Sequence, residues 1–217
     1  MIAAAEELLR SMRVLAERGL NVGAAGNASV RMPDGLLVTP SAVPAERLAP
    51  ELMVHLDQQG EVLAPLGGRP SSEWRMHRDI YAARPEVGAI VHTHSPAATG
   101  VACTRQDIPA FHYMVARLGG SDVRCGSYAT FGTQALSDAA LAALAGRRAC
   151  LLANHGQVAL GRDLPEALAT ALELEALAQH FLFALAAGGP VLLTAAEMAE
   201  ALARFTDYRP GLLPARD

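Results

Sequence analysis

The sequence predicts an α/β protein, in which a mixed, mostly antiparallel sheet is covered by helices within a single domain over residues 1–217. Segments with helical spacing of apolar residues are mixed with short apolar segments typical of strands. Several of the strands are joined by tight turns, which can connect antiparallel but not parallel neighbours. The 217 residues, 51% of them hydrophobic, are sufficient for one substantial core.

The first quarter of the chain contains a helix followed by two hairpins. Residues 2–18 have helical spacing and end at Gly19. Two pairs of strands then follow, each joined by a short turn that contains glycine, Pro33-Asp34-Gly35 in the first pair and Gln58-Gln59-Gly60 in the second. The four predicted strands cover residues 28–32, 36–39, 53–57 and 61–64.

The middle of the chain contains a helix, a buried strand and a second, short helix. Ser71-Ser72-Glu73 begins the first helix, which continues to about Ala83 because Pro85 disfavours helical backbone before it. Residues 87–92 are almost entirely apolar and predict a buried strand. Ser95-Pro96 then provides an N-cap and a proline at the first helical position.

The C-terminal part alternates helices and short strands. A helix is predicted from Thr133 to Leu144, and Gly161-Arg162 turns the chain after two strands. Thr194 and Glu197 have the spacing of a capping box and predict a last helix. The two strands and the long helix after them are predicted at residues 149–153, 157–160 and 163–187.

The absence of lysine limits the chemistry that the chain can perform. All 18 basic residues are arginine. Catalysis on a carbonyl group through a Schiff base requires a lysine amine. Carbonyl chemistry in this chain therefore requires another way to polarise the substrate, and a bound metal is the usual alternative.

Composition and charge argue against several classes of protein. The net charge is −4 and no basic patch is apparent, so we expect no nucleic acid partner. Charged residues interrupt the N-terminal segment, unlike a signal peptide, and the longest apolar runs are too short to span a bilayer. We therefore expect a cytoplasmic protein without a membrane partner. The three cysteines are widely spaced and are expected to be free thiols.

Three histidines follow predicted buried strands. Residues two apart in a strand share a face, so His92 and His94 can point toward one ion. His155 follows the other buried strand in a similar place. Three histidines with an open position are typical of a catalytic zinc site. Polar residues at strand ends are also common without a metal, and the spacing alone leaves both interpretations open.

Other residues suggest a carboxylate and an anion site near the histidines. Glu73 could act as a base, although a glutamate in a first helical turn is equally explained by the helix dipole. Gly26, Asn27, Ser71 and Ser72 lie in a glycine-rich loop and at a helix start, both of which can bind phosphate. Ordinary turns and caps explain these residues equally well.

Six segments together resemble the class II aldolase/adducin family, most closely its members that cleave L-fuculose 1-phosphate. They occur in the family's order and extend over most of the chain. The segments are residues 19–31 (GLNVGAAGNASVR), 70–77 (PSSEWRMH), 91–94 (VHTH), 109–114 (PAFHYM), 128–133 (YATFGT) and 154–156 (NHG).

The resemblance implies a three-layer α/β/α sandwich and a homotetramer with active sites between subunits. It assigns His92, His94 and His155 as ligands of one Zn²⁺ per subunit, or of another divalent metal. It assigns Glu73 as the catalytic acid/base and Tyr113 as a proton donor from across the interface. Further matches are the phosphate site, formed by Gly26, Asn27, Ser41, Ser71 and Ser72, and two residues that shape the cleft, Phe131 and Tyr208.

The implied activity is cleavage of a ketose 1-phosphate into dihydroxyacetone phosphate and an aldehyde, through an enediolate stabilised by the metal. A sugar-phosphate dehydratase and a sugar-acid-phosphate decarboxylase of the same family remain alternatives. A 4-epimerase is disfavoured because the epimerases carry aspartate where Glu73 stands. An adducin-like scaffold without activity is disfavoured because such domains lack the metal histidines.

Two positions of the implied phosphate site depart from the fuculose-phosphate-cleaving members. Ala24 stands where they have threonine, and Ala42 stands where they have glycine. Ser41 keeps a hydroxyl in the same loop. We therefore expect phosphate binding to persist with reduced strength, and the identity of the sugar stays open.

Overall fold

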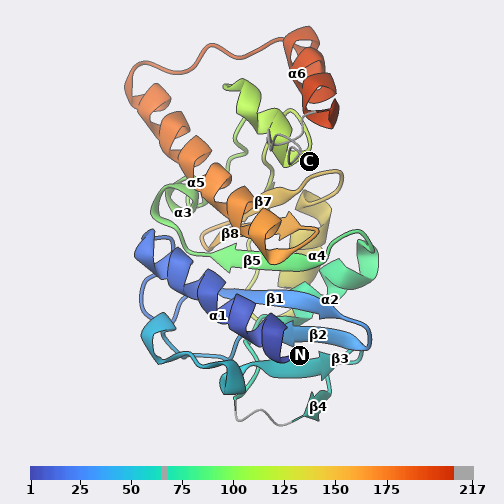
Figure 1. The fold of residues 1–217 in the computed structure, drawn as a ribbon. Helices are drawn as coiled ribbons and strands as arrows, with labels where there is room; N and C mark the ends of the chain where they lie inside the picture. Colours follow the sequence, from blue (N-terminus) through green and yellow to red (C-terminus); the bar gives the residue numbers. More distant parts are fainter. Residues whose placement is uncertain (65–67, 208–217) are drawn as a thin grey trace, which may run out of the picture.

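A computed structural model describes residues 1–64 and 68–207. Its centre is one eight-stranded sheet in the order β4-β3-β2-β1-β5-β8-β7-β6 (Figure 1). Every neighbouring pair is antiparallel except β6 and β7. The strands are β1 (Asn27–Met32), β2 (Gly35–Val38), β3 (Val54–Asp57), β4 (Val62–Ala64), β5 (Ala89–Thr93), β6 (Cys125–Gly126), β7 (Ala149–Leu152) and β8 (Gly156–Gly161).

Helices cover both faces of the sheet, which confirms the predicted three-layer architecture. On one face lie α2 (Trp74–Ala83) and α4 (Gln134–Ala143). On the other lie α1 (Ile2–Glu17), α3 (Pro96–Ala102) and α5 (Leu164–Ala186), of which α1 and α5 cross the front of the sheet in Figure 1. The last helix, α6 (Ala195–Asp207), packs against a short 3-10 helix, η3 (Tyr113–Leu118).

The alternation of side chains along the strands produces two buried faces. In β5, Ile90 belongs to the core beneath α2 and α4, whereas Ala89 and Val91 belong to the core beneath α1 and α5. In β2, Leu36 and Leu37 divide in the same way. Because apolar residues are required on both faces, these strands read as continuous apolar runs in the sequence.

The predicted elements are confirmed, with bounds that differ by one to three residues. The capping box is present, since Thr194 Oγ1 accepts from the backbone N–H of Glu197 at 3.3 Å and Glu197 Oε2 accepts from that of Thr194 at 2.7 Å. The sequence did not predict β6, η3 or two shorter 3-10 helices, η1 (Ala45–Arg47) and η2 (Pro50–Leu52). A strand of two residues and 3-10 helices of one or two turns are too short to show a helical or an alternating pattern of apolar residues.

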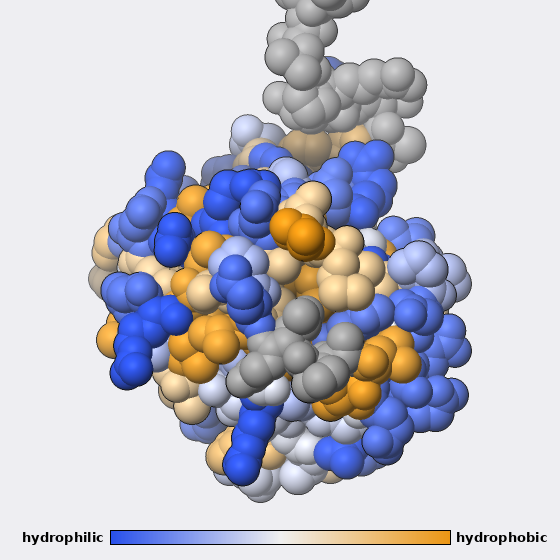
Figure 2. All heavy atoms as spheres, turned by 60° about the horizontal axis from the view of Figure 1, so that its bottom comes forward, coloured by the Kyte–Doolittle hydropathy of each residue, from blue (hydrophilic) through white to orange (hydrophobic). Residues whose placement is uncertain are grey.

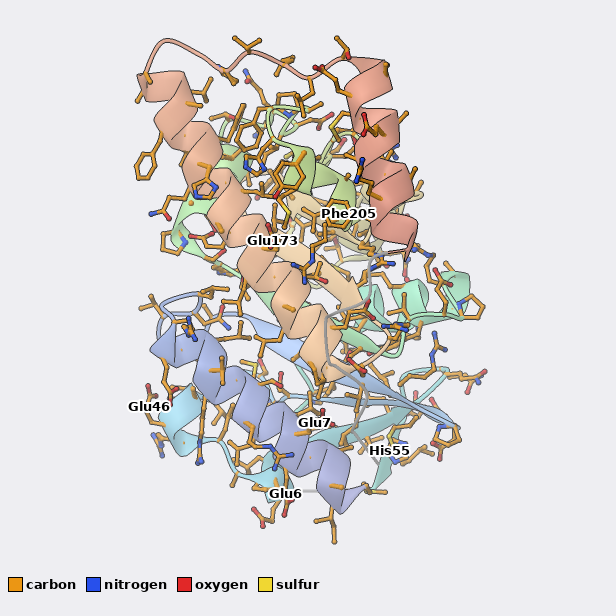
Figure 3. The ribbon with its side chains drawn as sticks, turned by 45° about the horizontal axis from the view of Figure 1, so that its top comes forward. Glu6, Glu7, Glu46, His55, Glu173 and Phe205 are labelled. Carbon is orange, nitrogen blue, oxygen red and sulfur yellow. The ribbon has the colours of Figure 1, made fainter. Side chains whose placement is uncertain are left out.

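The two ends of the sheet differ in what covers them. The β4 end, turned forward in Figure 2, mixes hydrophilic side chains with small hydrophobic groups, and Val62 and Leu63 are exposed there. At the other end, Phe205 of α6 lies beside η3 (Figure 3). Within the described part of the chain, α5 alone is long and apolar enough to cross a membrane, a test that core helices also pass.

Candidate active site

The three predicted histidines meet because β5 and β8 are antiparallel neighbours. His92 lies near the end of β5 and His94 follows that strand directly. His155 immediately precedes β8, and the register pairs Thr93 with Gln157, so the start of β8 lies beside the end of β5. Gly156 permits this approach, since a Cβ there would lie 2.3 Å from the carbonyl oxygen of Thr93.

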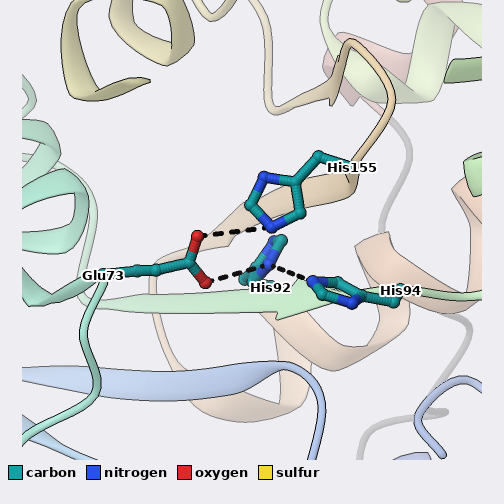
Figure 4. Close-up of side chains that lie close together, drawn as sticks. All are labelled: Glu73, His92, His94 and His155. Carbon is teal, nitrogen blue, oxygen red and sulfur yellow. Dashed lines mark hydrogen bonds and ion pairs between the residues drawn. The ribbon is translucent and has the colours of Figure 1, made fainter. Parts of the chain in front are cut away.

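The imidazole rings are arranged edge to face around a common point (Figure 4). Their centroids are 4.8–4.9 Å apart, with interplanar angles of 73–74°. The Nε2 atoms of His92 and His94 are 3.0 Å apart. One oxygen of Glu73 lies 3.2 Å from Nε2 of His92 and the other lies 3.3 Å from Nε2 of His155.

These residues fit a divalent metal. The ligand atoms of Glu73 and the three histidines all lie within 4.8 Å of one another. The other ring nitrogen of His92 lies 2.8 Å from the carbonyl oxygen of Gln157, so Nδ1–H donates to it and Nε2 is directed at the cluster. Among the described side chains, Glu73 Oε1 is one of few buried oxygens without a hydrogen-bond partner, as expected of an atom that faces a cation.

The electrostatics of the cluster favour metal binding at neutral pH. Burial and then the charge of His92 lower the pKa of both His94 and His155 to about 4, so at neutral pH each ring is uncharged and has one nitrogen free to bind a cation. Burial disfavours the charged form of His92, but the Glu73 carboxylate outweighs it and raises the pKa of His92. Burial also opposes ionisation of Glu73, yet the charge of His92 holds the pKa of that carboxyl below its usual range.

Glu73 does not cap its own helix. It occupies the N-cap position of α2, but its side chain accepts no hydrogen bond from the helix backbone. Instead the carboxylate turns toward His92 and His155, and it is only 6% exposed. The helix-dipole interpretation of this glutamate is therefore insufficient, because its position also serves the histidine cluster.

A cleft of about 360 Å³ opens above the cluster, and Glu73, His94 and His155 contribute to its lining. All five residues of the expected phosphate site line the same cleft, together with Phe131. These five are Gly26, Asn27, Ser41, Ser71 and Ser72. The expected phosphate residues thus face the same space as the carboxylate and two of the histidines.

Comparison with known proteins agrees with this arrangement. The model of the class II aldolase and adducin N-terminal domain family matches residues 6–182. The chain belongs to this family. Family membership and the relatives named aldolases identify it as a metal-dependent lyase, and its fold is that of the family.

Three relatives illustrate the similarity. A 5-methylthioribulose-1-phosphate/5-deoxyribulose-1-phosphate aldolase of Rhodospirillum rubrum is 51% identical over 207 residues, which cover 95% of this chain and 93% of the relative. An L-fuculose phosphate aldolase of Escherichia coli K12 is 42% identical over 94% of each chain. A solved L-fuculose 1-phosphate aldolase superposes with a TM-score of 0.90 at 37% identity, covering 94% of this chain and 96% of the other.

Of the two remaining residues expected at the site, Tyr113 lies away from this cleft and Tyr208 cannot be placed. Tyr113 lies in η3, is 55% exposed, and stacks between His112 and Phe205 with centroid distances of 4.9 and 6.4 Å. It does not line the cleft of its own class II aldolase subunit. Tyr208 lies outside the described residues.

The sequence analysis missed several residues of the site. Tyr128 and Asn154 line the cleft, and Asn154 accepts a 2.7 Å hydrogen bond from Arg105 Nε. His77 is fully buried and contacts Asn27. The available signal was its position four residues after Glu73, which places both side chains on one face of α2.

Ala42 has a backbone conformation that favours glycine. Its φ is 56°, which costs a residue with a Cβ roughly 1–2 kcal/mol. We expect Ala42→Gly to raise the free energy of unfolding by about 0.5–1 kcal/mol, because relief of this cost exceeds the added entropy of the unfolded chain. Chemical denaturation followed by circular dichroism measures this change.

Ala24 provides the matched control for that prediction. It lines the same cleft but is not among the described non-glycine residues with positive φ. Ala24→Gly should therefore lower the free energy of unfolding, by about 0.5–1 kcal/mol. Equal effects at both positions would contradict the explanation from backbone conformation.

Proposed function

We propose that this class II aldolase family member cleaves a ketose 1-phosphate into dihydroxyacetone phosphate and an aldehyde. The observation that carries the proposal is the meeting of three histidine Nε2 atoms and the Glu73 carboxylate beneath a cleft lined by serine and backbone donors. The relatives named aldolases, of which one is 51% identical over nearly the whole chain, support this reaction over the alternatives.

The phosphate group is proposed to bind at Gly26, Asn27, Ser41, Ser71 and Ser72. The chain contains no lysine, and none of the arginines within residues 1–64 and 68–207 lines the cleft, so we propose that hydroxyl and N–H donors bind the phosphate. Ser71 precedes α2, and the positive end of a helix dipole favours an anion at that place. Gly26, with a φ of 73°, lies so close to Asn21 that a Cβ would be 2.4 Å from its Oδ1.

His92, His94 and His155 are proposed to hold one Zn²⁺ per subunit. A bound Zn²⁺ supplies Lewis-acid stabilisation of the negative charge that develops on the substrate's oxygens when the carbon–carbon bond breaks. The protein's part is to make the three Nε2 atoms converge and to keep the rings of His94 and His155 uncharged. The hydrogen bond from His92 to the carbonyl of Gln157 and the low pKa values of His94 and His155 serve that purpose.

Glu73 is proposed to move the proton at the carbon of the dihydroxyacetone phosphate part that the bond cleavage leaves behind. Its carboxylate is ionised, faces the cleft, and is held by Asn27 at 2.9 Å. A proton is also needed at the aldehyde oxygen, and we propose that Tyr113 of a neighbouring subunit serves there. This role requires the homotetramer that the resemblance implies, because Tyr113 does not reach its own cleft.

Three candidate sugars follow from the names of the relatives. Their names specify L-fuculose phosphate in one case and 5-methylthioribulose 1-phosphate or 5-deoxyribulose 1-phosphate in another. The cleft combines donors for an anion with the aromatic side chains of Tyr128 and Phe131, the latter 65% exposed. We propose a ketose 1-phosphate whose far end contacts these rings, and the choice among the three sugars is left to experiment.

A panel of ketose 1-phosphates tests the proposal. It contains L-fuculose 1-phosphate, 5-deoxyribulose 1-phosphate and 5-methylthioribulose 1-phosphate, and release of dihydroxyacetone phosphate is measured with a coupled dehydrogenase. We expect release from at least one sugar, with loss of release after chelation and recovery after Zn²⁺ is added. Dehydration or decarboxylation without dihydroxyacetone phosphate would replace the aldolase with one of its alternatives.

Zinc as the native metal, the homotetramer, the single domain and the cytoplasmic location stay predictions. Metal analysis of the purified protein should find about one ion per subunit. Light scattering distinguishes a tetramer from smaller species, and a tetramer is required if Tyr113 acts across an interface. A monomer with full aldolase activity would remove that role from Tyr113.

A further inference from the structure

A line of buried hydrogen bonds extends behind Glu73, away from the cleft. Asn27 Nδ2 lies 2.9 Å from Glu73 Oε2, and Asn27 Oδ1 lies 2.6 Å from Nε2 of His77. Nδ1 of His77 lies 2.7 Å from Ser29 Oγ, which lies 2.8 Å from the hydroxyl of Tyr81. All five residues are buried. We call this set, from Tyr81 to Glu73, the buried hydrogen-bond chain.

The chemistry of its members fixes the direction of every hydrogen bond. An ionised carboxylate only accepts, so Asn27 must present its NH₂ group to Glu73. The amide oxygen of Asn27 then faces His77, whose Nε2 must therefore carry the proton. Nδ1 of a neutral imidazole is in turn an acceptor, so Ser29 donates to it.

The arrangement also prevents the Asn27 amide from turning over. A half-turn of this amide would place its oxygen against the carboxylate of Glu73, where two acceptors would repel each other. The same turn would bring its NH₂ group against the N–H of His77, where two donors would meet. Glu73 is the N-cap of α2 and His77 lies one turn further on, so the start of one helix carries both groups that hold the amide.

We propose that His77 is a positioning residue that fixes the Glu73 carboxylate for proton transfer by orienting Asn27. This inference rests on the aldolase function proposed above. A proton-transfer group has to be held within a fraction of an ångström of its productive place. Asn27 is the neutral donor to Glu73, and a protonated Nε2 of His77 holds the other end of its amide.

The tautomer of His77 provides a direct test. Solid-state NMR of the zinc-loaded, full-length protein with ¹⁵N-labelled histidine distinguishes a protonated ring nitrogen from a bare one. The His77 signals are assigned by their loss in His77→Gln. We expect a neutral ring with the proton on Nε2. A ring protonated on Nδ1 would overturn the inference, whatever the activity of the protein.

The kinetic test compares His77→Leu with His77→Gln. The leucine variant removes the donor to Asn27, and we expect kcat to fall by about 100-fold while KM changes little, because the carboxylate loses its position while Gly26 and the three serines of the phosphate site remain. The glutamine variant keeps an N–H near the place of Nε2 and should recover most of the lost kcat. Metal content is measured in each variant.

His55→Leu is the matched control. His55 is also buried and hydrogen-bonded, at 2.9 Å to Asp34, but it lies in β3 and has no contact with the buried hydrogen-bond chain. It should lower stability without changing kcat per folded subunit. Normal kcat in His77→Leu, or equal losses in both His77 variants, would overturn the inference. Absence of cleavage by the unmodified protein on every sugar would instead overturn the proposed aldolase function.

Discussion

His155→Ala is expected to lose the bound metal and, with it, aldol cleavage. His155 supplies one of three converging Nε2 atoms, and its ring is partly exposed to the cleft. Loss of a partner that merely orients a metal ligand already lowers affinity 10- to 100-fold, so loss of a ligand should lower it by at least about 100-fold. Metal per subunit after dialysis measures the effect.

The variant should nevertheless fold. The side chain of His155 precedes β8 and is not part of the two apolar cores of the sheet. His55→Ala serves as the control, since it removes a buried histidine that is far along the sheet from the cluster, in β3 rather than β5 or β8. Full metal content in His155→Ala, with the fold intact, would show that the three histidines do not form the metal site.

Metal occupancy should also fall as the pH falls. His94 and His155 have pKa values lowered to about 4, so both are ready to bind a cation at neutral pH and become protonated only as the pH approaches 4. The Glu73 carboxylate raises the pKa of His92, so a metal ion must displace a proton there first. As the pH falls, protons therefore compete with the metal first at His92 and then at His94 and His155. Dialysis at a series of pH values should show the metal being released on acidification.

The strands that carry the histidines could be predicted, but their adjacency could not. The apolar runs before His92 and His155 identify β5 and β7, and the tight turn after β7 places His155 at the start of β8. That β8 inserts between β5 and β7 is a long-range pairing, with the register Thr93 to Gln157. Local patterns specify a strand and its faces, whereas the order of strands depends on the packing of the whole sheet.

Residues that act through other residues were the least predictable. His77 carries no sequence signal beyond its spacing from Glu73, and its contact with Asn27 arises because α2 packs over β1. The structure also gives Asn27 a contact that was not predicted from the sequence. The resemblance placed it in the phosphate site, and the structure shows both ends of its amide engaged, by Glu73 and by His77.

The proposed role of Tyr113 could not be derived from the physical properties of a single chain. Its proposed role depends on a second subunit, and a single chain places its ring between His112 and Phe205 rather than in the cleft. Only the resemblance suggested that it serves a neighbouring site. The histidines, Glu73, Ser71 and Ser72 could be proposed as site residues from one chain, because their positions are fixed within one sheet and its covering helices.

Glu73→Gln is expected to keep the fold and the metal but to lower kcat by about 10²- to 10⁴-fold, the usual contribution of a general acid or base. Glutamine has nearly the same shape as glutamate and can still accept from Asn27, but it cannot take up and return a proton. The three histidines remain to bind the metal. Single-turnover cleavage of the preferred ketose 1-phosphate and metal analysis of the same sample separate these two properties.

Two further variants make this result specific. Glu73→Asp keeps the charge but withdraws it by one methylene from His92 and His155, so its activity should lie between those of the unmodified protein and Glu73→Gln. Glu86→Gln removes an exposed carboxylate that pairs with Arg84 outside the cleft, and it should leave kcat unchanged. Near-normal turnover in Glu73→Gln would leave Glu73 only the role of holding the histidine cluster, and the proton would then have to come from another group in the cleft.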